Sequence, residues 1–146
     1  EKLELALALG ATRAFRADDP DIVAQLRAAI PGGVDVAIEA ASAVPALELA
    51  WQLTRRGGTT VTCSLPNPGH RLQLPVVQMT AEERTLKGSY LGSAVPTRDI
   101  PRYIELYKAG RLPVDRLITH RLSLDEINAG FDRLAAGDAV RQVILF

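Results

Sequence analysis

The sequence has very little cysteine and histidine. Cys63 is the single cysteine among 146 residues, and the two histidines are His70 and His120. One cysteine excludes a disulfide bond within the chain, and these three residues do not make up a Cys/His set for a structural zinc ion. We therefore expect no metal site built from this chain alone.

The sequence also lacks net charge and long apolar runs. Its 17 Lys and Arg residues balance 17 Asp and Glu residues, which gives no electrostatic reason to expect nucleic acid or an anionic membrane surface as a partner. No apolar run approaches the roughly 20 residues that span a bilayer. Hydrophobic residues make up 47 % of the chain, as in globular proteins. We expect a globular protein in the cytoplasm.

Local motifs of catalytic and phosphate-binding sites are missing as well. There is no G-x-S-x-G, H-E-x-x-H or C-x-x-C motif, and no strand is followed by G-x-G-x-x-G. His70 falls in a turn and His120 near a strand end, where surface or packing roles are favoured over catalysis. Cys63 falls in a predicted buried strand, where a small apolar filler is the default. The residues by themselves therefore indicate no catalytic group.

What the sequence does contain is a regular alternation of helical and strand patterns over its first 65 residues. Periodicity and turn residues predict a helix over 2–9, a strand over 12–15, a helix ending near Ile30, a strand over 34–40, a helix over 44–54 and a strand over 59–65. Such an alternation is typical of a doubly wound α/β sheet. The chain also begins at Glu1, inside a helical pattern, so we expect a piece of a longer protein.

Two helix starts carry capping signals. Asp19 can cap the second helix, with Pro20 in its first turn, and Ser42 is the expected cap of the third. The strand between these helices alternates Val34, Val36 and Ile38 with residues that include Ala37. A strand that is apolar on both faces indicates a parallel sheet covered by helices.

The second half of the chain mixes strands and helices less regularly. The patterns predict a short exposed strand over 72–74, a helix over 76–83, a strand over 85–91, a helix over 97–109, a strand over 117–122, a helix ending near Gly137 and a strand over 141–146. Ser123 and Glu126 form a capping-box pattern at the start of the last helix. We expect an α+β segment at the C-terminal end.

Six blocks of sequence, in order, resemble the zinc-containing medium-chain alcohol dehydrogenase family. They are Lys2 to Thr12, Gly32-Gly33-Val34-Asp35-Val36-Ala37-Ile38-Glu39, Arg56-Gly57-Gly58-Thr59-Thr60-Val61, Leu86-Lys87-Gly88-Ser89-Tyr90-Leu91-Gly92, Ile118-Thr119-His120-Arg121-Leu122 and Ile127-Asn128-x-Gly130-Phe131-Asp132. Each block alone is weakly specific. Together they cover nearly all of the chain.

The resemblance implies a partial Rossmann domain. Residues 1–91 would be a dinucleotide-binding domain without its first two strands, and residues 92–146 would return to the catalytic domain. In the strand order 3-2-1-4-5-6 the strand over 12–15 would then lack a neighbour, and the strand over 34–40 would be an open edge. Open edges invite pairing with another chain. We expect a homo-oligomer formed through Leu72-Gln73-Leu74 and Thr85–Tyr90.

The resemblance also implies cofactor contacts at eight positions. Lys2 would lie near the adenosine ribose and Arg141 would reach the pyrophosphate. The remaining positions would line the nicotinamide side: Ala40 and Ala41 after one strand, Cys63 and Leu65 at the end of the next, and Ser89 and Leu91 at the carboxamide. Other interpretations stay open: Lys2 as a solvated lysine, Arg141 paired with Asp138, and Ala40, Ala41 and Leu65 as core residues.

Two positions depart from the family pattern. Ser42 stands where the family usually has glycine after the alanine pair, and Ser64 stands at another usual glycine. A side chain at either place can narrow the site or hydrogen-bond to a ligand.

The implied function is oxidoreduction of a small alcohol or aldehyde by hydride transfer to or from NAD, with NADP as an alternative cofactor. The catalytic zinc, its ligands and the proton relay would belong to an N-terminal domain outside this sequence, so this chain would be inactive in isolation. Two alternatives are a non-catalytic oligomerisation module and part of a zinc-free quinone or enoyl reductase of the same superfamily.

Overall fold

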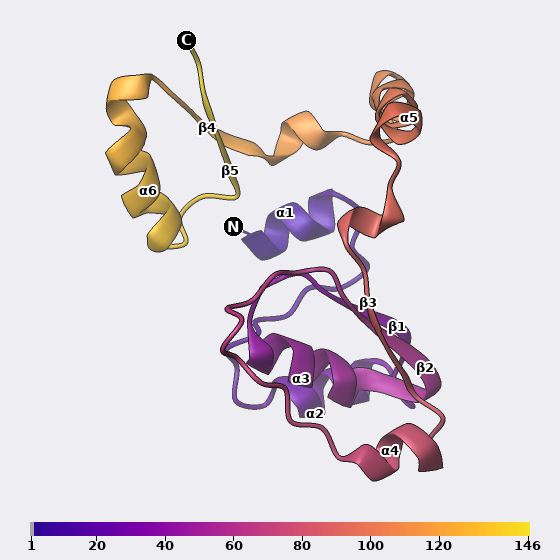
Figure 1. Cartoon of the computed structure of the whole chain (residues 1–146). Coiled ribbons are helices and arrows are strands. Elements are labelled where there is room, and N and C mark those ends of the chain that lie inside the picture. The colour runs from indigo at the N-terminus through magenta and orange to yellow at the C-terminus, as the bar shows by residue number, and fades with distance from the viewer. Residues whose placement is uncertain (1) are drawn as a thin grey trace. The chain divides into compact units, whose positions relative to one another are not determined.

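A computed structural model describes residues 2–146 of the chain. The chain divides into two compact units. The three-strand unit comprises residues 15–94, and the two-strand unit comprises the described residues 2–14 together with 95–146. Figure 1 shows helices and strands in both units, which confirms the α/β class.

The three-strand unit contains a parallel sheet. Its strands are β1 (Val34–Glu39), β2 (Thr54–Thr62) and β3 (Thr85–Gly88), in the order β1-β2-β3. β1 has one neighbour among the described strands, so the expected open edge is confirmed. This sheet is the partial doubly wound sheet that the sequence predicts.

Helix α3 (Val44–Leu53) connects β1 to β2 and contacts both strands, and α2 (Ile22–Ala29) contacts α3 (Figure 1). Pro45 suits the first turn of α3 because its fixed φ matches the helix and its missing N–H would have no partner there. At the other end of the helix, Trp51 is buried, with 2 % of its surface exposed.

The start of β2 is irregular. Val34 pairs with Thr54 but Val36 pairs with Thr59, so residues 55–58 bulge out of the ladder. Gly57, at φ +66°, donates its N–H to the Glu82 carbonyl at 2.8 Å. Glu82 directly follows helix α4 (Val76–Ala81), so the bulge is tied to the chain segment that leads into β3.

Five expectations for local structure are wrong. Residues 12–15 and 72–74 form no strand, because each segment lacks a neighbouring strand to pair with in the described chain. α2 begins at Ile22 with Asp21 as its N-cap, and Asp19 instead accepts the N–H of Asp21 at 2.8 Å. Pro20 therefore precedes the helix. Ser42 does not cap α3, whose N-cap is Ala43.

The two-strand unit contains α1 (Lys2–Ala8), α5 (Pro96–Lys108), the short 3-10 turns η2 (Val114–Leu117) and η3 (Leu124–Glu126), and a β4–α6–β5 arrangement. Strands β4 (Ile118–Leu122) and β5 (Arg141–Ile144) are parallel and joined through α6 (Ile127–Ala135). The capping box is confirmed: the Ser123 N–H and hydroxyl donate to Glu126 Oε2 at 2.8 and 2.9 Å.

None of the helices described over residues 2–146 combines the length and the apolar character that crossing a membrane requires.

Candidate functional site at the carboxyl edge of the three-strand sheet

The carboxyl ends of β1, β2 and β3 lie level with one another. Glu39 pairs with Thr62, and Thr62 pairs with Gly88. Beyond these pairs, Cys63 donates its N–H to the Glu39 carbonyl at 3.0 Å and Ser89 donates its N–H to the Thr62 carbonyl at 2.9 Å. The segments that follow the three strands therefore leave the sheet side by side, at the edge where open α/β sheets bind ligands.

A buried carboxylate holds this edge together. Glu39 is 4 % exposed. Its Oε1 accepts the Ala41 N–H at 2.6 Å, and its Oε2 accepts the hydroxyls of Thr62 at 2.7 Å and Ser64 at 2.6 Å. Hydrogen bonds to a charged acceptor are short and strong, so three donors compensate for the water that the carboxylate loses on burial.

The same contacts set the ionisation of Glu39. Burial raises the pKa of a carboxyl group, but the Ser64 and Thr62 hydroxyls and the backbone N–H groups of Ala41 and Ser42 lower it, and the net pKa of Glu39 lies below its ordinary value. The carboxylate is therefore charged at neutral pH. Its stabilising effect is present above the unfolded-state pKa and is lost as the pH falls through the folded-state pKa.

The two departures from the family pattern both lie at this carboxylate. Ser42 has φ +56°, in the left-handed region that favours glycine, which explains why glycine is usual there. The Ser64 hydroxyl does not point free into the site, because it donates to Glu39. The added hydroxyl at position 64 thus supplies an anchor that glycine lacks.

The structure brings six of the eight predicted cofactor residues into the three-strand unit. Ala40 and Ala41 directly follow β1, Cys63 and Leu65 follow β2, and Ser89 and Leu91 follow β3. Ala40, Ala41, Cys63, Leu65 and Leu91 are exposed, and Ser89 is half-buried. Exposure rules out the core interpretation of Ala40, Ala41 and Leu65, and the filler interpretation of Cys63 is wrong because the strand ends at Thr62.

The other two predicted residues belong to the two-strand unit. Lys2 is exposed on α1 and Arg141 is exposed at the start of β5. Over the described residues 2–146 Arg141 and Asp138 form no ion pair, and the Arg141 carbonyl accepts the Thr119 hydroxyl at 3.1 Å. The Arg141 side chain borders a cavity of about 230 Å³ between β4, α6 and β5.

Sequence reasoning missed Glu39 and Thr62 as site residues. The available signal was an acidic residue at the carboxyl end of a strand whose other positions are mostly apolar. In an open α/β sheet such a residue faces the ligand edge. The pairing of Thr62 and Ser64 with this carboxylate depends on the β1–β2 register, which the sequence does not reveal.

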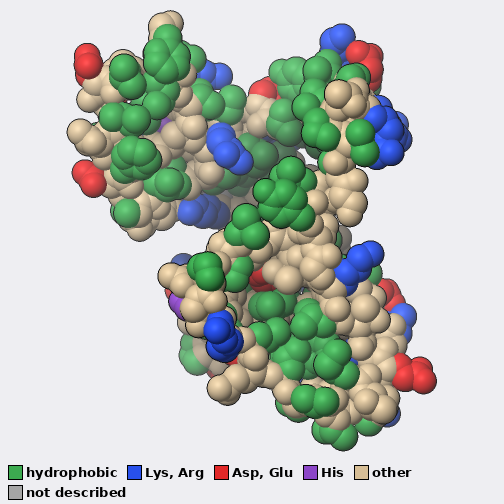
Figure 2. Space-filling view, in the orientation of Figure 1, with side chains coloured by type: hydrophobic (Ala, Val, Ile, Leu, Met, Phe, Trp, Pro, Cys, Tyr) green, Lys and Arg blue, Asp and Glu red, His purple; other side chains and the backbone are tan. Residues whose placement is uncertain are grey.

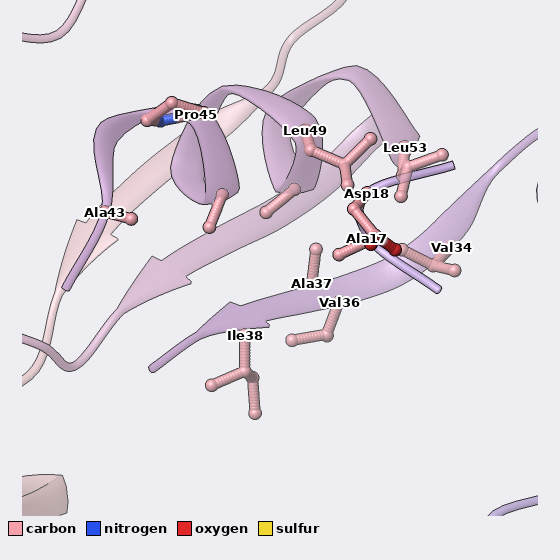
Figure 3. A pocket seen from close by; sticks show the side chains of 12 residues that line it. Ala17, Asp18, Val34, Val36, Ala37, Ile38, Ala43, Pro45, Leu49 and Leu53 are labelled. Atoms are coloured by element: carbon pink, nitrogen blue, oxygen red, sulfur yellow. The ribbon is translucent and has the colours of Figure 1, made fainter. Parts of the chain in front are cut away.

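The open edge of β1 borders an apolar groove of about 610 Å³. In Figure 3, Ala37 points toward α3, whereas Val36 and Ile38 point to the opposite side. Val36 is 55 % exposed and Ile38 is 69 % exposed. Figure 2 shows hydrophobic side chains gathered on the visible face of this unit. The face of β1 that α3 does not cover is therefore apolar and open.

Metal ligands are not gathered anywhere in the described chain. Across residues 2–146 no group of three or more His, Cys, Asp or Glu side chains is placed to hold a metal ion. His120 Nδ1 lies 3.0 Å from the Thr119 hydroxyl, and His70 lies in an exposed turn. The residues present do not fit a zinc centre.

Comparison with known proteins points to one family. The sequence model of the zinc-binding dehydrogenases matches residues 1–109. An alcohol dehydrogenase of Amycolatopsis methanolica that depends on NDMA is 37 % identical over 99 % of this chain and 40 % of its own length.

Solved structures agree with the sequence comparison. The crystal structure of benzyl alcohol dehydrogenase from Acinetobacter calcoaceticus matches 98 % of this chain and 39 % of its own, with a TM-score of 0.89 and 29 % identity. A protein described as a zinc-binding dehydrogenase from Sinorhizobium meliloti, bound to NADP, matches 99 % and 42 %, with a TM-score of 0.81 and 28 % identity. The chain thus spans about two fifths of the length of these relatives.

Proposed function

This chain belongs to the zinc-binding dehydrogenase family, and we propose that it forms the nicotinamide side of the cofactor site in an alcohol dehydrogenase. The intact enzyme would oxidise a small alcohol, or reduce an aldehyde, with NAD as the cofactor and NADP as the alternative. The relatives are alcohol dehydrogenases, and they do not favour a non-catalytic oligomerisation module or a zinc-free quinone or enoyl reductase.

The observation that carries this proposal is the level carboxyl edge of the sheet. Small or exposed residues follow each of its three strands, so main-chain groups are accessible there. An aromatic ring with a carboxamide needs a flat apolar contact and main-chain hydrogen-bonding groups, and this edge offers both. Ala40, Ala41, Cys63, Leu65, Ser89 and Leu91 would form this contact.

Two charged side chains would contribute the polar contacts. Arg141 would bind the pyrophosphate, because a guanidinium pairs well with phosphate oxygens, and Lys2 would lie near the adenosine ribose. When bound, the nicotinamide supplies the carbon that exchanges hydride with the substrate. The residues of this chain would bind and orient it. We propose that the catalytic zinc is held by residues outside these 146.

Calorimetry with NADH on the purified chain tests the proposal. We expect weak binding, because the described chain has no glycine-rich phosphate loop after a strand. Replacing Arg141 with Ala should weaken binding about two- to fivefold, as expected for one exposed ion contact. The matched control is Arg121→Ala, which removes an exposed arginine from the neighbouring strand β4. Absence of heat at millimolar NADH, or equal effects of the two variants, would contradict the proposal.

We also propose that the intact protein is a homo-oligomer that assembles through Leu72-Gln73-Leu74 and Thr85–Tyr90. β3 supports this because it is the outer strand of the sheet opposite β1, with backbone groups available on one side. Sedimentation equilibrium should show a dimer that Leu74→Glu dissociates. Gln73→Glu, an exposed neighbour in the same segment, is the control. A monomer at every concentration would refute this mode of assembly.

A further inference from the structure

Glu39 is a buried charged group at the edge of the proposed cofactor site, although nothing in the proposed chemistry uses it. We propose that its carboxylate is the positioning residue for the two loops that would face the nicotinamide, residues 40–42 and 63–65, with the Ser64 hydroxyl as its anchor on the second loop. This inference rests on the proposed function, because that function assigns those loops to the cofactor.

The two oxygens of the carboxylate serve different loops. Oε1 accepts the N–H of Ala41, in the loop after β1. Oε2 accepts the hydroxyl of Thr62 at the end of β2 and the hydroxyl of Ser64 in the loop that follows. One side chain therefore joins two loops, and Ser64 in the second loop lies 25 positions from Glu39 in the sequence.

Geometry explains why the charged form is required. All three contacts are donations to Glu39, and an ionised carboxylate only accepts hydrogen bonds. A protonated carboxyl group would direct an O–H toward one of these partners, and a hydroxyl partner would then have to accept instead of donate. The full set of three donations to Glu39 is therefore the arrangement that suits the ionised carboxylate.

The first loop needs such a restraint. Ser42 adopts φ +56°, which is unfavourable for a residue with a Cβ. The N–H groups of Ala41 and Ser42 both stabilise the Glu39 carboxylate. A strained backbone conformation persists when surrounding contacts restrain it, and here the hydrogen bonds to the Glu39 carboxylate restrain residues 40–42.

The second loop has a hydroxyl where the family usually has glycine. Glycine at position 64 would leave Glu39 with Thr62 and the first loop as its partners. Ser64 extends the hold of the carboxylate to the loop that contains Cys63 and Leu65. If either loop lost its fixed conformation, the surface on which a nicotinamide ring would lie would no longer have a defined shape.

Nuclear magnetic resonance of the isotope-labelled full chain tests this role, with Glu39→Gln, Ser64→Ala and Ser64→Gly as variants. Asp35→Asn is the matched control, because Asp35 is a carboxylate on the same strand that pairs with Arg55 at 2.5 Å, far from the carboxyl edge. Circular dichroism verifies that each variant is folded, and the two Ser64 variants keep the test open if Glu39→Gln does not fold.

The pH titration of the Ala41 amide is the first readout. In the unmodified chain we expect a midpoint below about 4.3, the ordinary value of a glutamate carboxyl group. Ser64→Ala and Ser64→Gly should raise that midpoint, Glu39→Gln should abolish the transition, and Asp35→Asn should leave it unchanged. An ordinary midpoint that Ser64→Ala does not move would overturn the proposal.

Amide hydrogen exchange is the second readout. Loss of a hydrogen bond to a charged group should accelerate exchange about tenfold or more at the Ala41 amide in Glu39→Gln. The amides of Thr60 and Val61, inside the β1–β2 pairing, should keep their rates. Uniform acceleration over the whole unit would indicate general destabilisation and would overturn the positioning role.

Addition of NADH separates this proposal from the proposed function. If NADH perturbs the amides of both loops and the perturbation is weaker in Ser64→Ala, the result supports both the positioning role and the cofactor contact. Equal perturbation in the unmodified chain and in Glu39→Gln overturns the positioning role and leaves the cofactor contact standing. No perturbation at millimolar NADH, together with the expected titration and exchange, supports the positioning role and overturns the cofactor contact.

Discussion

Two of the parallel strand pairs in the described chain, β1–β2 through α3 and β4–β5 through α6, use the same topology differently. In the three-strand unit, β1–α3–β2 buries Trp51, Thr54 and Thr60 and ends in the Glu39 carboxylate. In the two-strand unit, β4–α6–β5 buries Leu122 and Ala139, and its helix leaves Phe131 61 % exposed.

Polar groups account for much of this difference. The hydroxyls of Thr54 and Thr60 lie 2.7 Å apart in the interior of the three-strand unit, and Thr54 also donates to the Ala50 carbonyl at 2.8 Å. In the two-strand unit Gln142 donates to the Gly130 carbonyl at 2.7 Å. Satisfied polar groups in the interior rigidify a unit and specify a single arrangement of its core.

Exposed apolar residues characterise the second strand pair. Phe131 and Leu134 of α6 lie beside the cavity that Arg141 borders. A helix with an exposed apolar stripe gains less from folding alone than a helix whose aromatic residue is buried. The comparison therefore indicates that β1–α3–β2 is the more strongly stabilised of the two arrangements.

The largest expected effect is truncation of the buried indole. Trp51 donates to Gln78 at 2.9 Å and lies under the Arg84 guanidinium at 5.4 Å. Trp51→Ala should lower the free energy of unfolding by about 3–5 kcal/mol, because it removes a large buried side chain and leaves a cavity. The control is Phe131→Ala on the helix of the other pair, with an expected loss below about 1 kcal/mol. Urea unfolding followed by circular dichroism measures the free energy of unfolding of each variant. Equal losses in the two variants would contradict the inference that β1–α3–β2 is the more strongly stabilised arrangement.

The joint between α3 and β2 should be the next most sensitive position. A Cβ at Gly33, where φ is +94°, would lie 2.5 Å from the Leu53 carbonyl oxygen. Gly33→Ala should cost about 2–4 kcal/mol through backbone strain and a clash with rigid backbone. Gly32 has a similar φ of +89°, but a Cβ built there would have no heavy atom within 4 Å. Gly32→Ala therefore introduces the backbone strain without the clash and should cost less. Similar thermal midpoints for the two variants would contradict the proposed clash.

A glycine within the helix of the other strand pair should respond more weakly. A Cβ at Gly130 would lie 2.6 Å from Leu122 Cδ1, which is the end of a side chain rather than backbone. Leu122 can rotate away, and alanine favours the helix by about 1 kcal/mol over glycine. Gly130→Ala should therefore destabilise the chain less than Gly33→Ala, as thermal unfolding can measure. A larger loss at Gly130 would show that α6 packs as rigidly as α3.

The smallest effect should come from the capping box. Hydrogen bonds from the Ser123 backbone N–H and, next in size, from the Ser123 hydroxyl lower the pKa of Glu126. The ionised Glu126 therefore stabilises the fold above the unfolded-state pKa, and this contribution disappears as the pH falls through the folded-state pKa. Glu126→Gln should flatten the pH dependence of the unfolding midpoint between about pH 6 and pH 3 slightly, and less than Glu39→Gln does. A larger effect at Glu126 would reverse the expected ranking.

Sequence patterns predicted the elements well where local signals and pairing partners agree. The alternation of helix and strand over residues 34–62, the capping box at Ser123 and the open edge of β1 are confirmed. The strand over 12–15 is wrong although its residues suit a strand, because strand hydrogen bonds need a neighbour. The resemblance identified the family on blocks that are each weakly specific.

For the site, the sequence indicated positions but not contacts. It located the residues after each strand, and their cofactor roles stay predictions. It marked Ser42 and Ser64 as unusual, yet it gave Ser42 a capping role that the left-handed backbone at φ +56° rules out. It assigned Cys63 to the interior, although that residue lies beyond the end of β2 and is exposed.

The sequence by itself determined the α/β class, because helix and strand periodicities are local in the chain, and the resemblance of its motifs indicated the family and the partial sheet. Only the tertiary structure decided that Glu39, Thr62 and Ser64 form one cluster. That cluster depends on the register in which β1 pairs with β2, and register is set by packing between residues far apart in the sequence. The level strand ends and the charged carboxylate between their loops follow from that register.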